Sequence, residues 1–154
     1  MGIGNFWDMA KTALIFYQGD FPAGGMWRYG YMLAKGLVTT DKENQYSLIH
    51  ARSCPENFIG LEPYEKLLPL KWWQKIIFLP KILRRQGFNV VHVTENACPF
   101  FINAPYKKIV TVHDLMPLGL SYSVNLSTKL YYKFYLPWAL SKVDKIVTVS
   151  QYSK

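Results

Sequence analysis

The chain has 154 residues, half of them hydrophobic, which suffices for one domain with a real core and argues against wholesale disorder. Its formal net charge of +8 favours anionic partners, namely phosphorylated ligands, anionic lipid surfaces or nucleic acid. The two cysteines, Cys54 and Cys98, lack metal or redox spacing, so we interpret them as reduced thiols of a cytoplasmic protein, with a disulfide as the minor alternative.

Five short apolar runs alternate with helical patterns along the chain. The first strand is expected at 12–17, a run too short for a signal peptide or a membrane span. Apolar residues at steps of three and four then predict a helix over 26–37. A second strand is expected at 46–51, and three prolines predict a long surface loop over 52–70.

The second half of the chain repeats this alternation. A helix is expected at 71–85, where Pro80 should kink the helix or end its first half. Another helix is expected at 126–140, with Asn125 or Ser127 as its N-terminal cap. Three further apolar runs predict strands at 89–94, 108–113 and 145–150.

Strands that alternate with helices are typical of parallel βαβ units in α/β proteins. The near-continuous apolar strands agree, because parallel strands are covered on both faces. We therefore predict a Rossmann-like, doubly wound parallel sheet with the strand order 3-2-1-4-5. Ligands bind such a sheet where the strand order reverses, which predicts a crevice between the loop 20–25 and the pair His113-Asp114.

Two glycines, Gly24 and Gly25, directly precede the first predicted helix. Free amides at a helix N-terminus, with glycines that permit close approach, suit a phosphate or pyrophosphate. A tight turn between strand and helix explains the pair equally well. The loop matches neither the dinucleotide-binding pattern G-x-G-x-x-G nor a P-loop.

His113 is the strongest single candidate, because it ends an apolar strand at the predicted switch point. Asp114 cannot easily orient this ring, since neighbouring strand side chains point in opposite directions, and an Asx turn is the favoured role for it. Ser150 ends the last strand at the same edge, but the sequence lacks the G-x-S-x-G pattern of a hydrolase nucleophile.

Two more polar residues lie within or directly after the third predicted strand. His92 lies between valines and is expected to be a buried, hydrogen-bonded core histidine. Glu95 follows the strand and either reaches a ligand or is a solvated loop carboxylate. No combination of His, Cys, Asp and Glu has metal-ligand spacing, so no metal site is predicted.

The predicted helix 71–85 combines basic and apolar residues. Its core stripe consists of Trp72, Ile76, Leu79 and Leu83. Basic residues mixed with exposed apolar ones are typical of an anionic membrane interface. A sheet-covering helix with a solvated basic face is the favoured alternative, because Pro80 limits the available length. The membrane-facing candidates are Lys71, Lys75, Phe78, Lys81, Arg84 and Arg85.

Three segments, in order along the chain, resemble the N-terminal domain of a retaining GT-B glycosyltransferase of family 4. The first is the glycine pair with the amphipathic helix that follows it, at 22–37. The second joins 90–94 to 108–117, which reads Lys-Ile-Val-Thr-Val-His-Asp-Leu-Met-Pro. The third is the strand and serine at 143–154. The ordered set is more specific than any one segment.

The resemblance implies a two-domain enzyme with its active site between the domains, in which 1–154 form a single Rossmann-like, acceptor-side domain. Gly24 and Gly25 would lie near the diphosphate of a nucleotide-diphosphate sugar, and His113 near the transferred sugar. Transfer would need no metal or other cofactor. Asp20 would face the acceptor, which is a glycan or a lipid-linked molecule. The other cleft-lining candidates are Glu95, Asp114 and Ser150.

The chain departs from the family pattern in one respect. The family's donor-binding C-terminal domain carries an E-x7-E pair of carboxylates, and no such pair occurs in this sequence. We therefore expect the C-terminal domain to be absent and this chain alone to transfer no sugar.

The leading interpretation is thus a partial glycosyltransferase of polysaccharide biosynthesis. The alternative is a non-catalytic binding module of the same fold that docks a separate catalytic chain or an anionic membrane. Nucleic-acid binding lacks any recognition motif and is not expected. The expected location is the cytoplasm, either free or peripheral at the inner face of the membrane.

Overall fold

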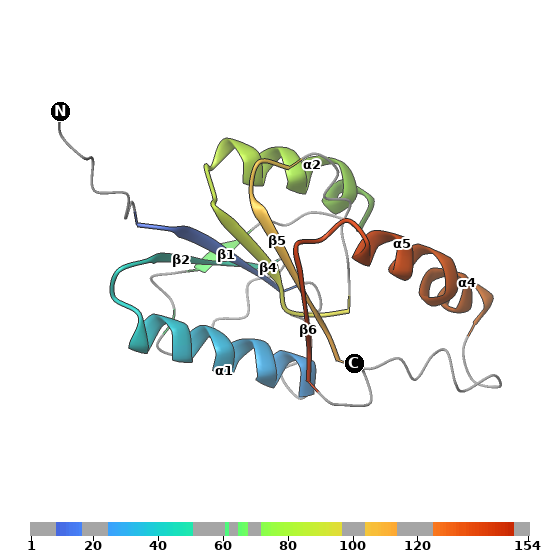
Figure 1. Ribbon diagram of the computed structural model, residues 1–154, viewed down its shortest axis with the longest axis horizontal. Coiled ribbons are helices and arrows are strands. Elements are labelled where there is room, and N and C mark those ends of the chain that lie inside the picture. Colours follow the sequence, from blue (N-terminus) through green and yellow to red (C-terminus); the bar gives the residue numbers. More distant parts are fainter. Residues whose placement is uncertain are drawn as a thin grey trace.

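The computed structural model describes residues 9–16, 25–50, 61, 65–67, 72–96, 104–113 and 125–149, with the backbone course alone for 65–67 and 72–77. Within these ranges a parallel sheet lies between helices on both of its faces (Figure 1). The predicted fold class, a Rossmann-like doubly wound α/β sheet, is confirmed.

The predicted strands and helices are all present, with ends that shift by a few residues. The strands are β1 (Lys11–Phe16), β2 (Gln45–His50), β3 (Glu65–Leu67), β4 (Val90–Val93), β5 (Lys107–Val112) and β6 (Lys145–Thr148). The helices are α1 (Gly25–Thr40), α2 (Trp72–Arg85) and one helix in three segments, α4 (Leu126–Leu130), η3 (Tyr131–Tyr135) and α5 (Leu136–Leu140).

Strand β3 and the strand order correct the prediction. The stretch 52–70 was expected to be a loop, but Glu65–Leu67 pairs with β2 as a short outermost strand, where three residues suffice for pairing. The order is β3-β2-β1-β4-β5-β6. The five predicted strands therefore lie in the order 2-1-3-4-5 instead of 3-2-1-4-5, with the additional strand outside the second.

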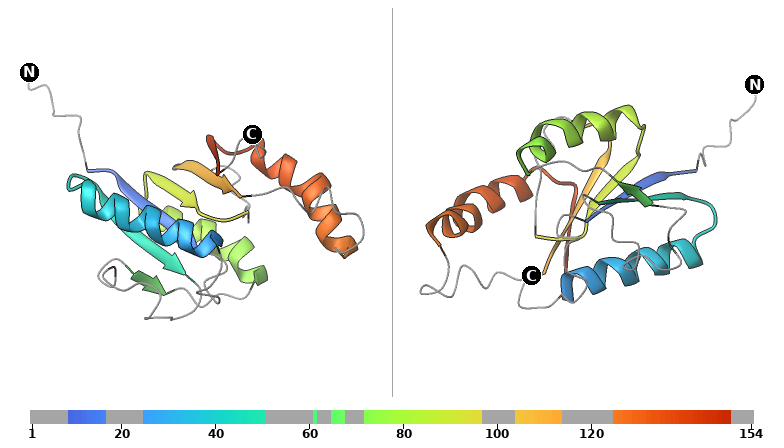
Figure 2. Two further views of the ribbon diagram at one scale, coloured as in Figure 1. Left: turned by 90° about the horizontal axis from the view of Figure 1, so that it is seen from below. Right: turned by 180° about the vertical axis from the view of Figure 1, so that it is seen from behind.

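Each face of the sheet packs on its own helices (Figure 2). Ala34 and Val38 of α1 contact the face that carries Leu14, Phe16 and Leu48. The residues of α2 and α5 that are buried against the opposite face are Leu79, Leu83, Leu136 and Ala139. Alternate residues of β1 and β2 thus enter separate cores, as the two-residue period of a strand requires.

Helix α2 runs from Trp72 to Arg85 and continues through Pro80, so the predicted end of its first half is wrong. A proline removes a single amide donor and can stay in a helix that tertiary contacts hold. Leu79 and Leu83, on either side of Pro80, are 3% and 0% exposed, which confirms this half of the predicted core stripe.

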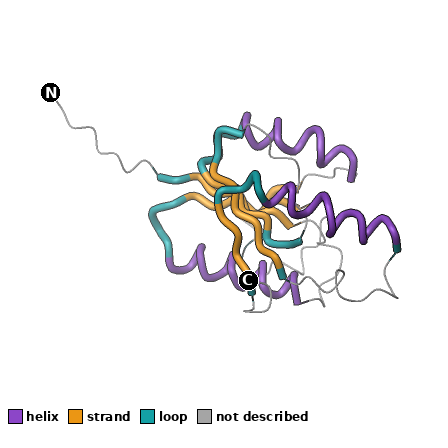
Figure 3. Tube along the Cα trace, turned by 45° about the vertical axis from the view of Figure 1, so that its right-hand side comes forward, coloured by secondary structure: helices purple, strands orange, loops and turns teal. Residues whose placement is uncertain are grey.

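The helix over 126–140 begins at Asn125, whose side-chain oxygen accepts from the Thr128 amide as predicted. It widens into a π-helical turn at η3, where the Leu136 amide donates to Tyr131 O, five residues earlier. Pro137 follows in the first turn of α5, a position that tolerates its missing amide hydrogen. In Figure 3 the helix runs beside the orange strands of the sheet.

Candidate functional site

The strand order reverses between β1 and β4, because β1 pairs with β2 on one side and with β4 on the other. Ligands of doubly wound sheets bind at the carboxyl edge beside such a reversal. The residues that follow β4 there are Thr94, Glu95 and Asn96. The sequence predicted that His113-Asp114 lie at the reversal itself. This prediction is wrong, because His113 follows β5, which lies one strand farther from β1 than β4 does.

His113 nevertheless reaches the reversal point. Its Nε2 lies 2.7 Å from the backbone oxygen of Thr94. A carbonyl oxygen only accepts, so Nε2 carries a hydrogen and donates it. The ring of Tyr29 on α1 meets the imidazole edge-on, with centroids 5.1 Å apart. The half-buried His113 ring is therefore held from two sides at the carboxyl edge of the sheet.

Asn96 ties three elements together at this edge. Its Oδ1 accepts from the His113 backbone amide at 2.6 Å, which joins the end of β4 to the end of β5. Its Nδ2 donates to Tyr132 Oη at 3.2 Å, and its backbone oxygen accepts from Tyr131 Oη at 3.1 Å. No role was predicted for Asn96 from the sequence. Its position after the strand next to the reversal was the feature that could have indicated one.

Helix α1 approaches the sheet closely beside His113, and Gly30 makes this possible. A Cβ atom on Gly30 would lie 2.6 Å from Phe16 Cε1 and 3.1 Å from Thr94 Oγ1. Phe16 is 1% exposed, so its ring cannot swing aside. The close approach brings Tyr29, one residue earlier on α1, to the strand residues at the carboxyl edge.

His92 is buried one layer below the edge, as predicted. Its Nε2 lies 2.8 Å from Thr111 Oγ1, and Tyr29 Oη lies 3.4 Å from the same hydroxyl. Burial lowers the pKa of His92 to about 4, because the charged ring would lose its hydration. His92 is therefore neutral at pH 7 and supports the packing of α1 on the sheet.

Glu95 is 2% exposed, so its alternative role as a solvated loop carboxylate is wrong. A carboxylate removed from water needs hydrogen-bond or charge partners. Its place directly after β4, next to the reversal, keeps Glu95 among the candidates for the site.

Several other predicted site residues have different outcomes. Gly25 is the first residue of α1, and a Cβ there would meet no atom within 4 Å. Among the residues that the structure describes, none therefore fills the space beside Gly25 at the N-terminus of this 16-residue helix. The predicted site residues that lie outside the described part of the chain are Asp20, Gly24, Asp114 and Ser150.

The predicted basic face of α2 is exposed where the structure describes it. Phe78 is 42% exposed, and the side chains of Lys81, Arg84 and Arg85 are exposed as well. Lys71 lies outside the described residues, and so does the side chain of Lys75. Both interpretations of this helix, a solvated basic face and a membrane contact, fit these exposures.

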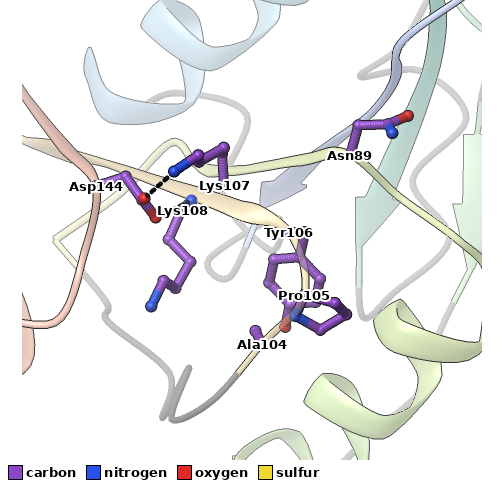
Figure 4. Close-up of a pocket in the computed structure, with 7 residues that line it drawn as sticks. All are labelled: Asn89, Ala104, Pro105, Tyr106, Lys107, Lys108 and Asp144. Carbon is purple, nitrogen blue, oxygen red and sulfur yellow. Dashed lines mark hydrogen bonds and ion pairs between the residues drawn. The ribbon is translucent and has the colours of Figure 1, made fainter. Parts of the chain in front are cut away.

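The opposite edge of the sheet has a pocket of about 230 Å³ (Figure 4). At its rim Lys107 Nζ lies 3.0 Å from Asp144 Oδ1, and the Lys108 amide donates to Asp144 Oδ2 at 2.9 Å. The hydrogen bond from the Lys108 backbone amide, followed by the one from the Lys107 side-chain ammonium group, lowers the pKa of Asp144. Asp144 thus fixes the starts of β5 and β6, far from the reversal. The lining residues are Asn89, Ala104, Pro105, Tyr106, Lys107, Lys108 and Asp144.

The described ranges contain neither a group of metal ligands nor a membrane-spanning helix. No described group of three or more His, Cys, Asp or Glu side chains could hold a metal ion. Among the helices that the structure describes, none has the length and apolarity needed to cross a membrane.

Comparison with known proteins gives one match. The family model described as Glycosyltransferase Family 4 matches residues 23–154. No curated protein and no solved structure matches the chain. The matched range begins just before α1 and includes every residue of the carboxyl edge described above.

Proposed function

The chain belongs to glycosyltransferase family 4, and we propose that it forms the acceptor-side half of a retaining enzyme that moves a glycosyl group from a nucleotide-diphosphate sugar to a glycan or lipid-linked acceptor. A glycosyltransferase-type function follows from the family itself. The observation that carries the finer proposal is His113, which is held at the carboxyl edge by Thr94 and Asn96 beside the strand reversal.

His113 would contact the transferred sugar. The hydrogen bond from its Nε2 to Thr94 and the ring of Tyr29 hold the imidazole before a substrate arrives, and the bond from its backbone amide to Asn96 holds the end of β5. Little ordering free energy is therefore lost on binding. Glu95 would line the same cleft. The remaining candidates would face the acceptor or line the cleft, and they lie in parts of the chain that the structure does not describe: Asp20, Asp114 and Ser150.

The amides at the start of α1 would stabilise the departing diphosphate. Negative charge develops on the leaving group during transfer, and aligned backbone amides lower its free energy without metal chemistry. Gly24 and Gly25 would admit the diphosphate to these amides, because glycine has no side chain and, among the described residues, a Cβ at Gly25 would meet no atom within 4 Å. We propose neither a metal nor another cofactor.

The proposal assigns the donor-binding carboxylates to a separate domain of the family, so the 154-residue chain alone would transfer no sugar. It also places the protein in the cytoplasm or at the inner face of the membrane, in polysaccharide biosynthesis. The alternative is a non-catalytic module of the same fold that docks a separate catalytic chain or an anionic membrane. The exposed Phe78 among the basic residues of α2 is the observation that favours it.

Nuclear magnetic resonance of histidine-labelled protein tests the proposal, because the chain has three histidines. Nucleotide-diphosphate sugars, soluble glycans and lipid-linked glycans would be titrated in turn. We expect at least one of these ligands to shift the ring signals of His113 and to leave those of the buried His92 in place, and we expect His113→Ala to weaken its binding.

The proposal fails if no ligand of any class moves the His113 signals. Robust turnover of a nucleotide sugar by the purified 154-residue chain would instead contradict the assignment of donor binding to another domain. A protein that binds no sugar ligand but captures a separate catalytic chain would support the alternative.

A further inference from the structure

The helix formed by α4, η3 and α5 is apolar on two opposite sides. Its inner side is part of the core, where Leu136 and Ala139 are 1% and 4% exposed. Its outer side carries large apolar residues that the described chain leaves in contact with solvent. We call these four residues the outer stripe: Leu126 at 71%, Leu130 at 47%, Phe134 at 61% and Trp138 at 43% exposure.

The π-helical turn keeps the outer stripe in line. In a regular α-helix the twelve-residue step from Leu126 to Trp138 would turn the two side chains about 120° apart. A single π turn takes up about one extra residue and reduces this difference to about 20°. The turn at Tyr131–Tyr135 lies midway along the stripe, so the four apolar side chains share one surface.

The charged residues of the helix itself have a single sign. The sequence from 125 to 143 contains Lys129, Lys133 and Lys142 but no aspartate or glutamate. Lys133 Nζ lies 5.5 Å from the centre of the Phe134 ring, so a cation borders the apolar surface directly. Aromatic and aliphatic residues flanked by lysine are suited to the interface of an anionic bilayer.

The helix is too short to cross a bilayer. Its three segments have five residues each, which gives a length of about 22 Å at 1.5 Å per residue. A bilayer core is about 30 Å thick. A helix of this length with an apolar stripe and flanking lysines lies along the interface, with the stripe among the acyl chains and the lysines at the headgroups.

We propose that the outer stripe docks on an anionic membrane surface and that this contact brings the carboxyl edge of the sheet to a lipid-linked acceptor. The choice of acceptor rests on the proposed function, whereas the membrane contact rests on the stripe alone. Phosphate headgroups of the bilayer supply the negative charge that the lysines require.

The inner side of the same helix is bonded to the candidate site. Tyr131 and Tyr132 hydrogen-bond Asn96, and Asn96 accepts from the His113 amide. A helix seated in the interface therefore fixes the position of His113 relative to the membrane. In Figure 1 the α4 end of this helix extends away from the sheet.

Helix α2 is the competing membrane face and supplies a control. Its described side chains include one exposed large apolar residue, Phe78, among Lys81, Arg84 and Arg85. Met32 on α1 supplies a second control, because it is 57% exposed and lies on the opposite side of the sheet from the stripe. Substitution of Phe78 or Met32 by serine removes one exposed apolar side chain from another face of the domain.

Co-sedimentation with vesicles tests the docking. The full chain would be mixed with phosphatidylcholine vesicles, with and without phosphatidylglycerol. We expect binding that requires the anionic lipid and falls with salt. The double variant Phe134→Ser with Trp138→Ser should bind about tenfold more weakly. Met32→Ser and Phe78→Ser should bind as the unchanged protein does.

The conservative variant Trp138→Phe provides a second test, which remains valid if the double variant fails to fold. Brominated acyl chains quench tryptophan emission within the bilayer. We expect the unchanged chain to be quenched and Trp138→Phe, which retains an apolar ring, to bind equally well with less quenching. Equal quenching in both proteins would overturn the placement of Trp138 in the bilayer.

Three results overturn the proposal: absence of binding to anionic vesicles, full binding by the double variant, or loss of binding in Phe78→Ser alone. A dimer in solution that the double variant converts to a monomer also overturns it, in favour of a second copy as the occupant. Failure of docking with a His113 signal that still responds to sugar ligands leaves the proposed function intact, so the two failures are distinguishable.

Discussion

The two faces of the sheet differ most in their polarity at β4 and β5. Each of these strands contributes side chains to both faces. Toward α2, the carboxyl-terminal halves of these strands present Val91, Val93, Val110 and Val112. Toward α1, the same strand ends present His92, Thr94, Thr111 and His113. The valine face stabilises the domain by burial, whereas the polar face forms a hydrogen-bonded column that leads to the carboxyl edge.

Neighbouring residues of one strand therefore have different roles. One stabilises the domain by burial, and the next belongs to the polar face that leads to the candidate site. Successive side chains point to opposite faces, so apolar packing on one side leaves the other free for polar groups. Buried polar groups reduce stability unless they are hydrogen-bonded. The bonds between His92 and Thr111, and between Thr94 Oγ1 and Ile15 O, satisfy this condition on the polar face.

The largest effect is expected on the valine face. Leu83→Ala on α2 should lower the free energy of unfolding by about 2–5 kcal/mol, because Leu83 is 0% exposed and its loss leaves a cavity. Urea denaturation measures this change. The matched control is Phe78→Ala on the same helix, which should stay within about 0.5 kcal/mol. Equal losses in the two variants would show that the valine face is not the main source of stability.

The polar face should respond to pH through His92. In the unfolded chain this ring binds a proton below its ordinary pKa of 6.5, but in the folded protein burial lowers the pKa to about 4. The unfolded state therefore binds more protons between these values. The free energy of unfolding should fall by about 3 kcal/mol as the pH decreases from 6.5 to 4.

His92→Gln is the test of this pH dependence. Glutamine does not titrate and can still bond Thr111, so the variant should lose much of the decline between pH 6.5 and 4. Asp41 and Asp144 also have lowered pKa values, but their acid effects occur in both proteins and cancel in the comparison. Parallel stability curves for the two proteins would refute the role assigned to the buried ring.

The approach of α1 to the polar face can be tested with two glycines of one helix. Gly30→Ala should lower the free energy of unfolding by about 1–3 kcal/mol, because its Cβ would meet the immobile Phe16 ring. Gly36→Ala meets no atom within 4 Å and should instead stabilise the helix by about 0.5–1 kcal/mol. Thermal or urea unfolding of both variants shows whether the signs differ as expected.

The valine face was predictable from the sequence, because it depends on local pattern. Apolar runs located the strands, and steps of three and four located α1 and α2. The strand order was not predictable, since it depends on where each crossover returns to the sheet. Strand β3 was missed for a related reason: three residues in a proline-rich stretch have no periodicity of their own.

The polar face was predictable only in part. His92 and His113 stood out, because each interrupts or ends a run of apolar residues. Asn96 did not, because its partners His113, Tyr132 and Tyr131 lie 17 to 36 residues away along the chain. The burial of Glu95 was not predictable for the same reason, because nothing in its neighbouring residues indicates that the carboxylate is buried.

The smallest expected effect is at Asn96, which bonds Tyr131 and Tyr132 of the helix formed by α4, η3 and α5. Tyr132→Phe removes one hydrogen bond and should lower the free energy of unfolding by about 1 kcal/mol. It should leave the His113 amide protected from hydrogen exchange, because Asn96 Oδ1 still accepts from it. Asn96→Ala removes the bond to the His113 amide as well and should instead expose that amide to faster exchange. Equal exchange of the His113 amide in both variants would mean that Asn96 does not hold the end of β5, and that the helix is coupled to the site by packing alone.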